Sequence, residues 1–230
     1  MIYLVKREAD TGVQGADVWH KRLGWAFGLI ASDPAERAAA LVRLADAERN
    51  TQDARDRYNQ TWRRRYSLGR QAARRNYLEA RRCSLPGGLW DRPAGSDIGM
   101  WPGLPYVLLF LEWEARYPQE WTRHAKAWGT KERLIRDVAA AHLDETVRTK
   151  LVELVETVVQ RPYRCKDREY ARVARAVDSD DLRSRLEVAS RSDNPWACRH
   201  AGYVLWLLDR PEVPNTRHVW RIWLAAASGE

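Results

Sequence analysis

The stretch that most constrains the fold runs from Trp101 to Trp121 and is the most hydrophobic helix candidate in the chain. Between Leu104 and Trp113 hardly any position is polar on any face of a helix. A helix that is apolar all round belongs in the middle of a helical protein. We therefore expect a central helix that the other helices cover.

One carboxylate, Glu112, interrupts this apolar run. A carboxylate is almost never fully buried without a partner, so Glu112 is expected to meet an arginine, a histidine or a ligand. This makes Glu112 a candidate catalytic base. The structural alternative is a buried ion pair with Arg199 or Arg221 of the C-terminal helices.

Length and composition indicate a single globular domain covering residues 1–230. No apolar run approaches the roughly 20 residues that span a bilayer, and the first residues lack a secretory pattern. We therefore expect a cytoplasmic protein that does not contact a membrane. Cys83, Cys165 and Cys198 are odd in number and lack metal-ligand spacing, so neither a disulfide framework nor a metal site is expected.

Hydrophobic periodicity and capping residues predict an all-α protein. Ser32-Asp33-Pro34 marks the start of a helix that could continue to about Ser67. The short apolar run Ile2–Val5 remains unassigned between strand and docked arm. Apart from the central stretch, helices are predicted over residues 16–30, 34–67, 131–142, 144–160, 166–177, a short segment after Ser179, 196–208 and 216–227.

A Gly- and Pro-rich segment, Ser84–Pro105, separates the N-terminal helices (1–83) from the central and C-terminal helices (106–230). A loop of this length within a compact domain is usually a lid, a binding loop or a linker. It carries Trp90 and Asp91, which are therefore candidate substrate-binding residues. The alternative is an interdomain linker.

Arginine is concentrated between Arg55 and Arg82, where ten arginines face only two acidic residues. Aromatic residues are interleaved with them, a composition typical of surfaces that bind phosphates and stack bases. The segment could contact nucleic acid or an acidic protein, or could be a solvated helix face. The residues chosen to represent this surface are Arg63, Arg64, Arg65, Arg74 and Arg75.

Helices of about a dozen residues joined by capped turns are typical of helical repeats. The segment Ser192-Asp193-Asn194-Pro195-Trp196, followed by Arg199, resembles the start of the inner helix of a HEAT-like repeat. HEAT-like DNA glycosylases carry a comparable segment, and this resemblance implies that Trp196 and Arg199 would face DNA. The Trp-Asp motif of those enzymes lies only a few tens of residues upstream, whereas Trp90-Asp91 lies more than 100 residues before Arg199.

The last two predicted helices place polar side chains among apolar ones. Arginine in such surroundings binds carboxylate, sulfate or phosphate, and histidine moves protons near neutral pH. The alternative is a set of structural ion pairs. The candidates are His200 and His218 as catalytic residues, and Arg199, Arg221, Tyr203 and Trp196 as substrate-binding residues.

The chain has no nucleophile elbow, HExxH, phosphate-binding loop or dinucleotide fingerprint, so no cofactor is expected. The leading hypothesis is a cofactor-independent enzyme for an anionic or carrier-bound small molecule, conceivably in natural-product biosynthesis. A base would activate a nucleophile while arginine holds the anionic group, in a transfer or elimination reaction. The alternatives are a DNA- or RNA-binding repeat protein and a non-catalytic scaffold that binds proteins.

Overall fold

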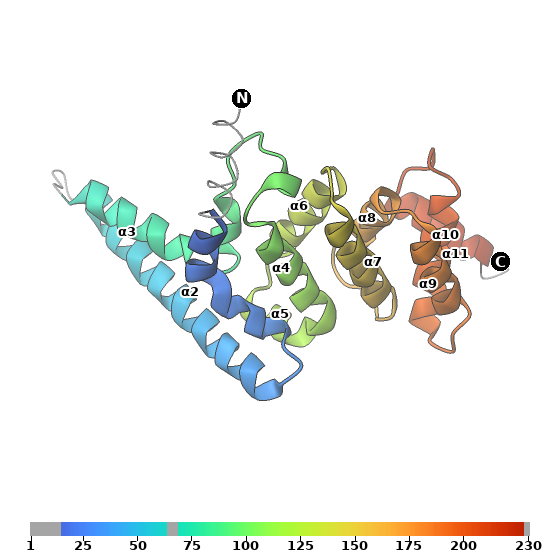
Figure 1. The fold of residues 1–230 in the computed structure, drawn as a ribbon, viewed down its shortest axis with the longest axis horizontal. Coiled ribbons are helices and arrows are strands. Elements are labelled where there is room, and N and C mark those ends of the chain that lie inside the picture. Colours follow the sequence, from blue (N-terminus) through green and yellow to red (C-terminus); the bar gives the residue numbers. More distant parts are fainter. Residues whose placement is uncertain (1–14, 64–68, 228–230) are drawn as a thin grey trace, which may run out of the picture. The chain divides into compact units, whose positions relative to one another are not determined.

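The computed structural model describes residues 15–63 and 69–227, and within these ranges it contains helices and no strand (Figure 1). The predicted all-α class is confirmed. Residue contacts group the chain into two compact units, residues 1–127 (unit 1) and 128–230 (unit 2). The sequence predicts a single domain over residues 1–230.

The described part of unit 1 starts with a helix over residues 15–23 that tightens into the 3-10 helix η1 (Gly24–Ile30). Asp33 then accepts a hydrogen bond from the amide of Ala35, and α2 (Pro34–Arg63) follows. This helix starts where the Ser-Asp-Pro signal predicts. It pairs with α3 (Arg70–Arg82) in a long hairpin (Figure 1).

The predicted central helix is two helices, α4 (Leu104–Arg116) and α5 (Pro118–His124). Pro118 lacks an amide N–H and cannot continue a helix, so it takes the first position of the next one. The prediction of one helix up to Trp121 is therefore wrong. The expectation of a buried core holds, because Phe110, Trp113 and Trp121 are fully buried and their rings adjoin.

Position along α4 decides which carboxylate is buried. Leu108, Glu112 and Arg116 recur at helical spacing on a partly exposed face. The Glu112 side chain is 26% exposed and pairs with Arg116 at 3.0 Å. The expectation that Glu112 is buried is therefore wrong, and the arginine that it pairs with belongs to the same helix. The fully buried carboxylate is Glu114, two residues further on, and it is not an unpaired charge.

The Gly- and Pro-rich segment 84–105 is folded onto unit 1 through two short 3-10 helices, η2 (Gly87–Trp90) and η3 (Ile98–Met100). Its side chains Leu85, Leu89 and Ile98 are buried. Asp91 pairs with Arg82 at 3.0 Å, while Trp90 is 40% exposed. Asp91 therefore anchors the segment to α3, and the lid function of the segment stays a prediction.

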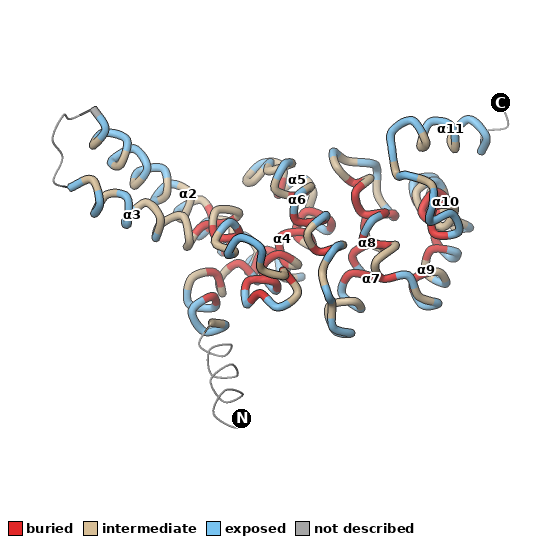
Figure 2. The backbone as a smooth tube through the Cα atoms, turned by 90° about the horizontal axis from the view of Figure 1, so that it is seen from above, coloured by how far each residue is buried: buried red, intermediate tan, exposed pale blue. Residues whose placement is uncertain are grey.

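Unit 2 contains six α-helices and one 3-10 helix among its described residues, close to the predicted positions. Asp144, Ser179 and Asn194 cap three of the helices with their side chains, as their sequence contexts predict. Figure 2 shows buried positions along α7, α8, α9 and α10, whereas α11 has none. The elements are α6 (Trp128–Ala139), α7 (Glu145–Val159), η4 (Asp167–Glu169), α8 (Tyr170–Ala176), α9 (Asp180–Ser190), α10 (Pro195–Leu208) and α11 (Arg217–Ala227).

None of the helices in the described ranges combines the length and apolar composition needed to cross a bilayer.

Candidate functional site

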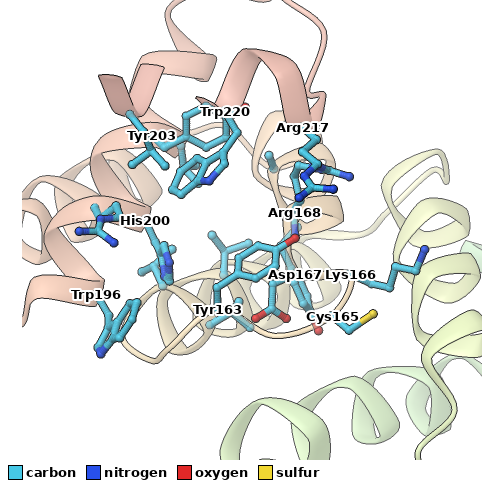
Figure 3. A pocket seen from close by; sticks show the side chains of 18 residues that line it. Tyr163, Cys165, Lys166, Asp167, Arg168, Trp196, His200, Tyr203, Arg217 and Trp220 are labelled. Atoms are coloured by element: carbon cyan, nitrogen blue, oxygen red, sulfur yellow. The ribbon is translucent and has the colours of Figure 1, made fainter. Parts of the chain in front are cut away.

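A pocket of about 580 Å³ lies within unit 2, among α7, the segment before α8, α10 and α11 (Figure 3). This volume falls in the range of pockets that hold small organic molecules. Its residues are Val155, Val158, Val159, Tyr163, Cys165, Lys166, Asp167, Arg168, Tyr170, Ala171, Trp196, Arg199, His200, Tyr203, Val204, Arg217, Trp220 and Leu224.

Asp167 fixes the segment that joins α7 to α8. Its carboxylate accepts hydrogen bonds from Lys131 Nζ at 2.6 Å, from Arg161 Nη1 at 2.8 Å and from the Arg164 amide at 2.7 Å. Lys131 is fully buried and Asp167 is 7% exposed. A buried carboxylate with this many donors is held in place by its hydrogen bonds. Asp167 is therefore a structural anchor of the pocket wall.

Asn215 fixes the opposite side, where α11 begins. Its Nδ2 donates to the Arg168 carbonyl at 2.5 Å, and its Oδ1 accepts from the Tyr203 hydroxyl at 3.2 Å. Burial raises the pKa of Tyr203, so its phenol stays protonated and can donate this bond. Asn215 therefore links α11 to both α10 and the segment before α8.

Three arginines that line the pocket, Arg168, Arg199 and Arg217, have no acidic partner within the described part of the chain. The Nε–H of Arg168 is buried without a hydrogen-bond partner there. In the view of Figure 3, Arg168 and Arg217 lie at one end of the pocket, and Trp196 and His200 lie at the other. Lys166 differs, because it pairs with Glu132 at 2.7 Å. The pocket therefore offers guanidinium groups to an anion.

His200 lies in aromatic surroundings at the pocket wall. Its ring centroid is 6.2 Å from Tyr163, 6.1 Å from Trp196 and 6.2 Å from Trp220. Loss of solvation lowers the pKa of His200, and this effect exceeds the opposing influence of Asp167 and of a hydrogen bond to the Val159 backbone. His200 is therefore neutral near pH 7, and one of its ring nitrogens can accept a proton.

The structure brings together four of the residues selected from the sequence, namely Trp196, Arg199, His200 and Tyr203. His218 and Arg221 are not with them, because α11 turns Trp220 and Leu224 toward the pocket and leaves the other two exposed. Glu112, Trp90 and Asp91 belong to unit 1.

Of the 18 residues that line the pocket, 14 are not among the site residues predicted from the sequence. Tyr163, Lys166 and Arg168 come from the turn between α7 and α8, and Arg217 and Trp220 come from α11. A signal was present, because the turn reads RPYRCKDRE and has three arginines, one lysine and one tyrosine within nine residues. The hydrogen bonds of Asp167 fix the conformation of this turn and so decide which of its side chains face the pocket. No sequence motif predicts these hydrogen bonds.

Within the described ranges, no cluster of three or more His, Cys, Asp or Glu side chains has an arrangement that could hold a metal ion. Comparisons with protein families, with curated proteins and with solved structures gave no match. The geometry defines this site as a pocket with aromatic and aliphatic walls, one histidine with a lowered pKa, and three arginines that have no acidic partner among the described residues.

Proposed function

We propose that unit 2 binds an organic anion with a flat apolar body, and that His200 accepts a proton in a cofactor-independent reaction of this ligand. The observation that carries the proposal is the set of three unpaired arginines around an aromatic pocket.

The charge pattern of the pocket supports an anionic group on the ligand. Unit 2 has 18 basic and 16 acidic side chains, so nearly every arginine could find an acid. Many arginines of unit 2 do pair with an acidic side chain, and Arg183 pairs with both Asp178 and Asp209. The three arginines that line the pocket have no acidic partner among the described residues, so the anionic group of a ligand would add favourable charge pairs there. A carboxylate, sulfate or phosphate of the ligand could fill that role.

The walls support a flat apolar body. Val155, Val158 and Val204 form an aliphatic side, and Trp196 and Trp220 add broad ring surfaces. Apolar ligand surface gains roughly 25 cal/mol for each Å² removed from water. An aryl or short acyl group therefore fits these walls better than a sugar would.

His200 supports proton transfer, because a neutral imidazole among apolar rings can accept a proton without first losing one. It would take the proton from the bound ligand or from an attacking nucleophile, and return it to the leaving group. Neighbouring guanidinium groups would stabilise negative charge that develops on the ligand.

The binding step can be tested with two probes of equal size and opposite charge, 2-naphthoate and 2-naphthylmethylamine. Calorimetry and tryptophan fluorescence should show tighter binding of the carboxylate, by at least about tenfold, because only the anion meets the arginines. The double change Arg168→Gln/Arg217→Gln should remove this preference. Arg191→Gln is the matched control, because Arg191 is exposed and pairs with Glu187 outside the pocket.

Equal affinity for the two probes would refute the anion-binding part of the proposal, as would an equal loss in the Arg191 control. Once a substrate is found, His200→Gln should leave binding intact while the rate falls by about 10²- to 10⁴-fold, the usual contribution of a general base. An unchanged rate would remove His200 from the reaction.

A further inference from the structure

The hairpin of α2 and α3 presents arginines that have no acidic partner. Arg55, Arg57, Arg74 and Arg75 are exposed, and none of them forms an ion pair within the described residues. Arg82 contrasts with them, because it pairs with Asp91 and Glu79. The positive charge of this hairpin is therefore directed to solvent or to a partner.

Contacts between the two helices fix their register. The Thr51 hydroxyl donates to the Ala80 carbonyl at 3.1 Å. Further along, Tyr58 stacks on Tyr77, with ring centroids 6.1 Å apart and an interplanar angle of 5°. The two helices run antiparallel (Figure 1). The two contacts therefore show that Thr51 faces Ala80 and that Tyr58 faces Tyr77.

This register places Arg55 and Arg74 on the same side of the hairpin. With about 100° per residue, Arg55 lies about 60° around α2 from Tyr58, and Arg74 lies about 60° around α3 from Tyr77 in the same sense. In antiparallel helices that face each other, equal rotations in the same sense point to the same flank. Arg57 lies about 100° from Tyr58 in the opposite sense and therefore points to the other flank.

Trp62 belongs to the flank of Arg55 and Arg74. It lies about 40° from Tyr58 in the same sense, and its side chain is 60% exposed. Arg70 covers part of it, with Cζ 4.4 Å from the ring centroid, and donates to the Thr61 carbonyl. We call this surface the arginine flank, defined as Arg55, Trp62, Arg70 and Arg74.

We infer that the arginine flank binds the sugar-phosphate backbone of a nucleic acid. Guanidinium groups pair bidentately with phosphates, and an exposed tryptophan offers a stacking platform to a base. From Arg55 to Trp62 the helix rises about 10 Å, which matches about three phosphates at roughly 3.4 Å per nucleotide of one strand.

An acidic protein fits this surface less well. Protein interfaces have an apolar centre from which charged residues are depleted. Trp62 is the only large hydrophobic residue that is exposed on the described part of α2 beyond Val42 or on α3. A surface of arginines with one ring lacks that apolar centre and has the composition of a phosphate-binding surface.

The experiment uses the full chain with fluorescein-labelled 20-nucleotide single-stranded DNA, single-stranded RNA and 20-base-pair duplex DNA. Polyglutamate serves as the acidic polypeptide probe. Anisotropy at several salt concentrations should show nucleic-acid binding that weakens as salt rises, because bound phosphates release counterions. Arg55→Ala/Arg74→Ala should lower the affinity at least about tenfold and flatten the slope of log K against log salt by about one per arginine.

The matched control is Arg49→Ala/Arg57→Ala, which removes the same charge from exposed positions of α2 outside the arginine flank. Alanine keeps both helices, and circular dichroism checks this. The control should retain most of the affinity. Trp62→Leu should weaken single strands more than duplex, because only unpaired bases can stack on the ring.

Three results would overturn the inference. These are no binding at low salt, an equal loss in the flank and control variants, and polyglutamate binding as tight as DNA with the same dependence on Arg55 and Arg74. The last result would assign the flank to acidic proteins instead. None of the variants touches the pocket of unit 2, so the naphthoate assay remains an independent test of the proposed function.

Discussion

At the scale of single residues, burial decides the chemistry of His200. Desolvation lowers its pKa in the folded state relative to the ordinary value of 6.5. The unfolded chain therefore binds a proton at a higher pH than the folded chain does. The contribution of His200 to stability is fully present above about pH 6.5 and is lost as pH falls from there toward the lowered pKa of the folded state.

The change His200→Gln tests this dependence. Between pH 7.5 and pH 5.5 the melting temperature of the variant should fall less than that of the wild type, because glutamine does not titrate. Thermal unfolding at several pH values gives the measurement. His218→Gln, at an exposed position of α11, should keep the wild-type dependence. If the wild type and the His200 variant fall equally, the histidine is protonated without cost in the folded state.

At the scale of helices, α11 is held in position because its aromatic face packs against α10. No residue of α11 is buried, yet Trp220 and Trp223 pack on Tyr203 and Leu207 of α10. Trp220 meets Tyr203 edge to face with ring centroids 4.6 Å apart. Arg175 donates hydrogen bonds to the carbonyls of residues 207, 210 and 213, which holds the connection between the two helices. A few aromatic contacts and this arginine therefore position the last wall of the pocket.

Trp220→Ala should destabilise unit 2 by about 2 kcal/mol, which is less than the 3–5 kcal/mol of a fully buried tryptophan because Trp220 is only half-buried. It should also weaken naphthoate binding, since the ring lines the pocket. Ile222→Ala, on the exposed face of the same helix, should change stability by less than about 0.5 kcal/mol. Urea unfolding of both variants measures the difference, and equal costs would contradict this packing of α11.

Helix starts were the most predictable feature, because a cap depends on a few adjacent residues. Asp144, Ser179 and Asn194 each accept backbone amides as their sequence contexts indicate. Pro118 also marks a possible break in the sequence, but the apolar run before it and Trp121 after it favoured one continuous helix. The resemblance of the C-terminal helices to HEAT-like repeats stays a prediction, because similar helical hairpins arise in many folds.

The candidate site was predictable only in part. The α10 residues of the pocket were found because polar side chains stand out in an apolar helix. Glu114 is buried and Glu112 is not because of the way α4 is rotated about its axis in the core. The sequence does not show this rotation, because a helix that is apolar on every face has no distinct buried side. One partner of Asp167, Lys131, lies 36 residues away in sequence, and single-sequence patterns do not show such pairs.

At the scale of the whole molecule, the two proposals fall in different units. The net charge of +8 is divided unevenly, because unit 1 has 21 basic and 15 acidic residues and unit 2 has 18 and 16. A strong positive surplus favours contact with polyanions through long-range attraction. The nearly balanced unit 2 instead has three arginines without an acidic partner among the described residues at one pocket, Arg168, Arg199 and Arg217, which favours a small ligand.

This separation predicts that residues 128–230 fold and bind by themselves. Every pocket residue and every hydrogen bond reported for Asp167, Asn215 and Arg175 lies within this range. A fragment of about 100 residues is also large enough for an independent core.

The fragment should unfold cooperatively and bind 2-naphthoate with the affinity of the full chain, within about threefold. The same fragment should lose the salt-dependent nucleic-acid binding, since the arginine flank belongs to unit 1. A fragment that folds but does not bind naphthoate would show that the pocket needs residues from the first 127, and one that still binds DNA would move the nucleic-acid surface away from the hairpin.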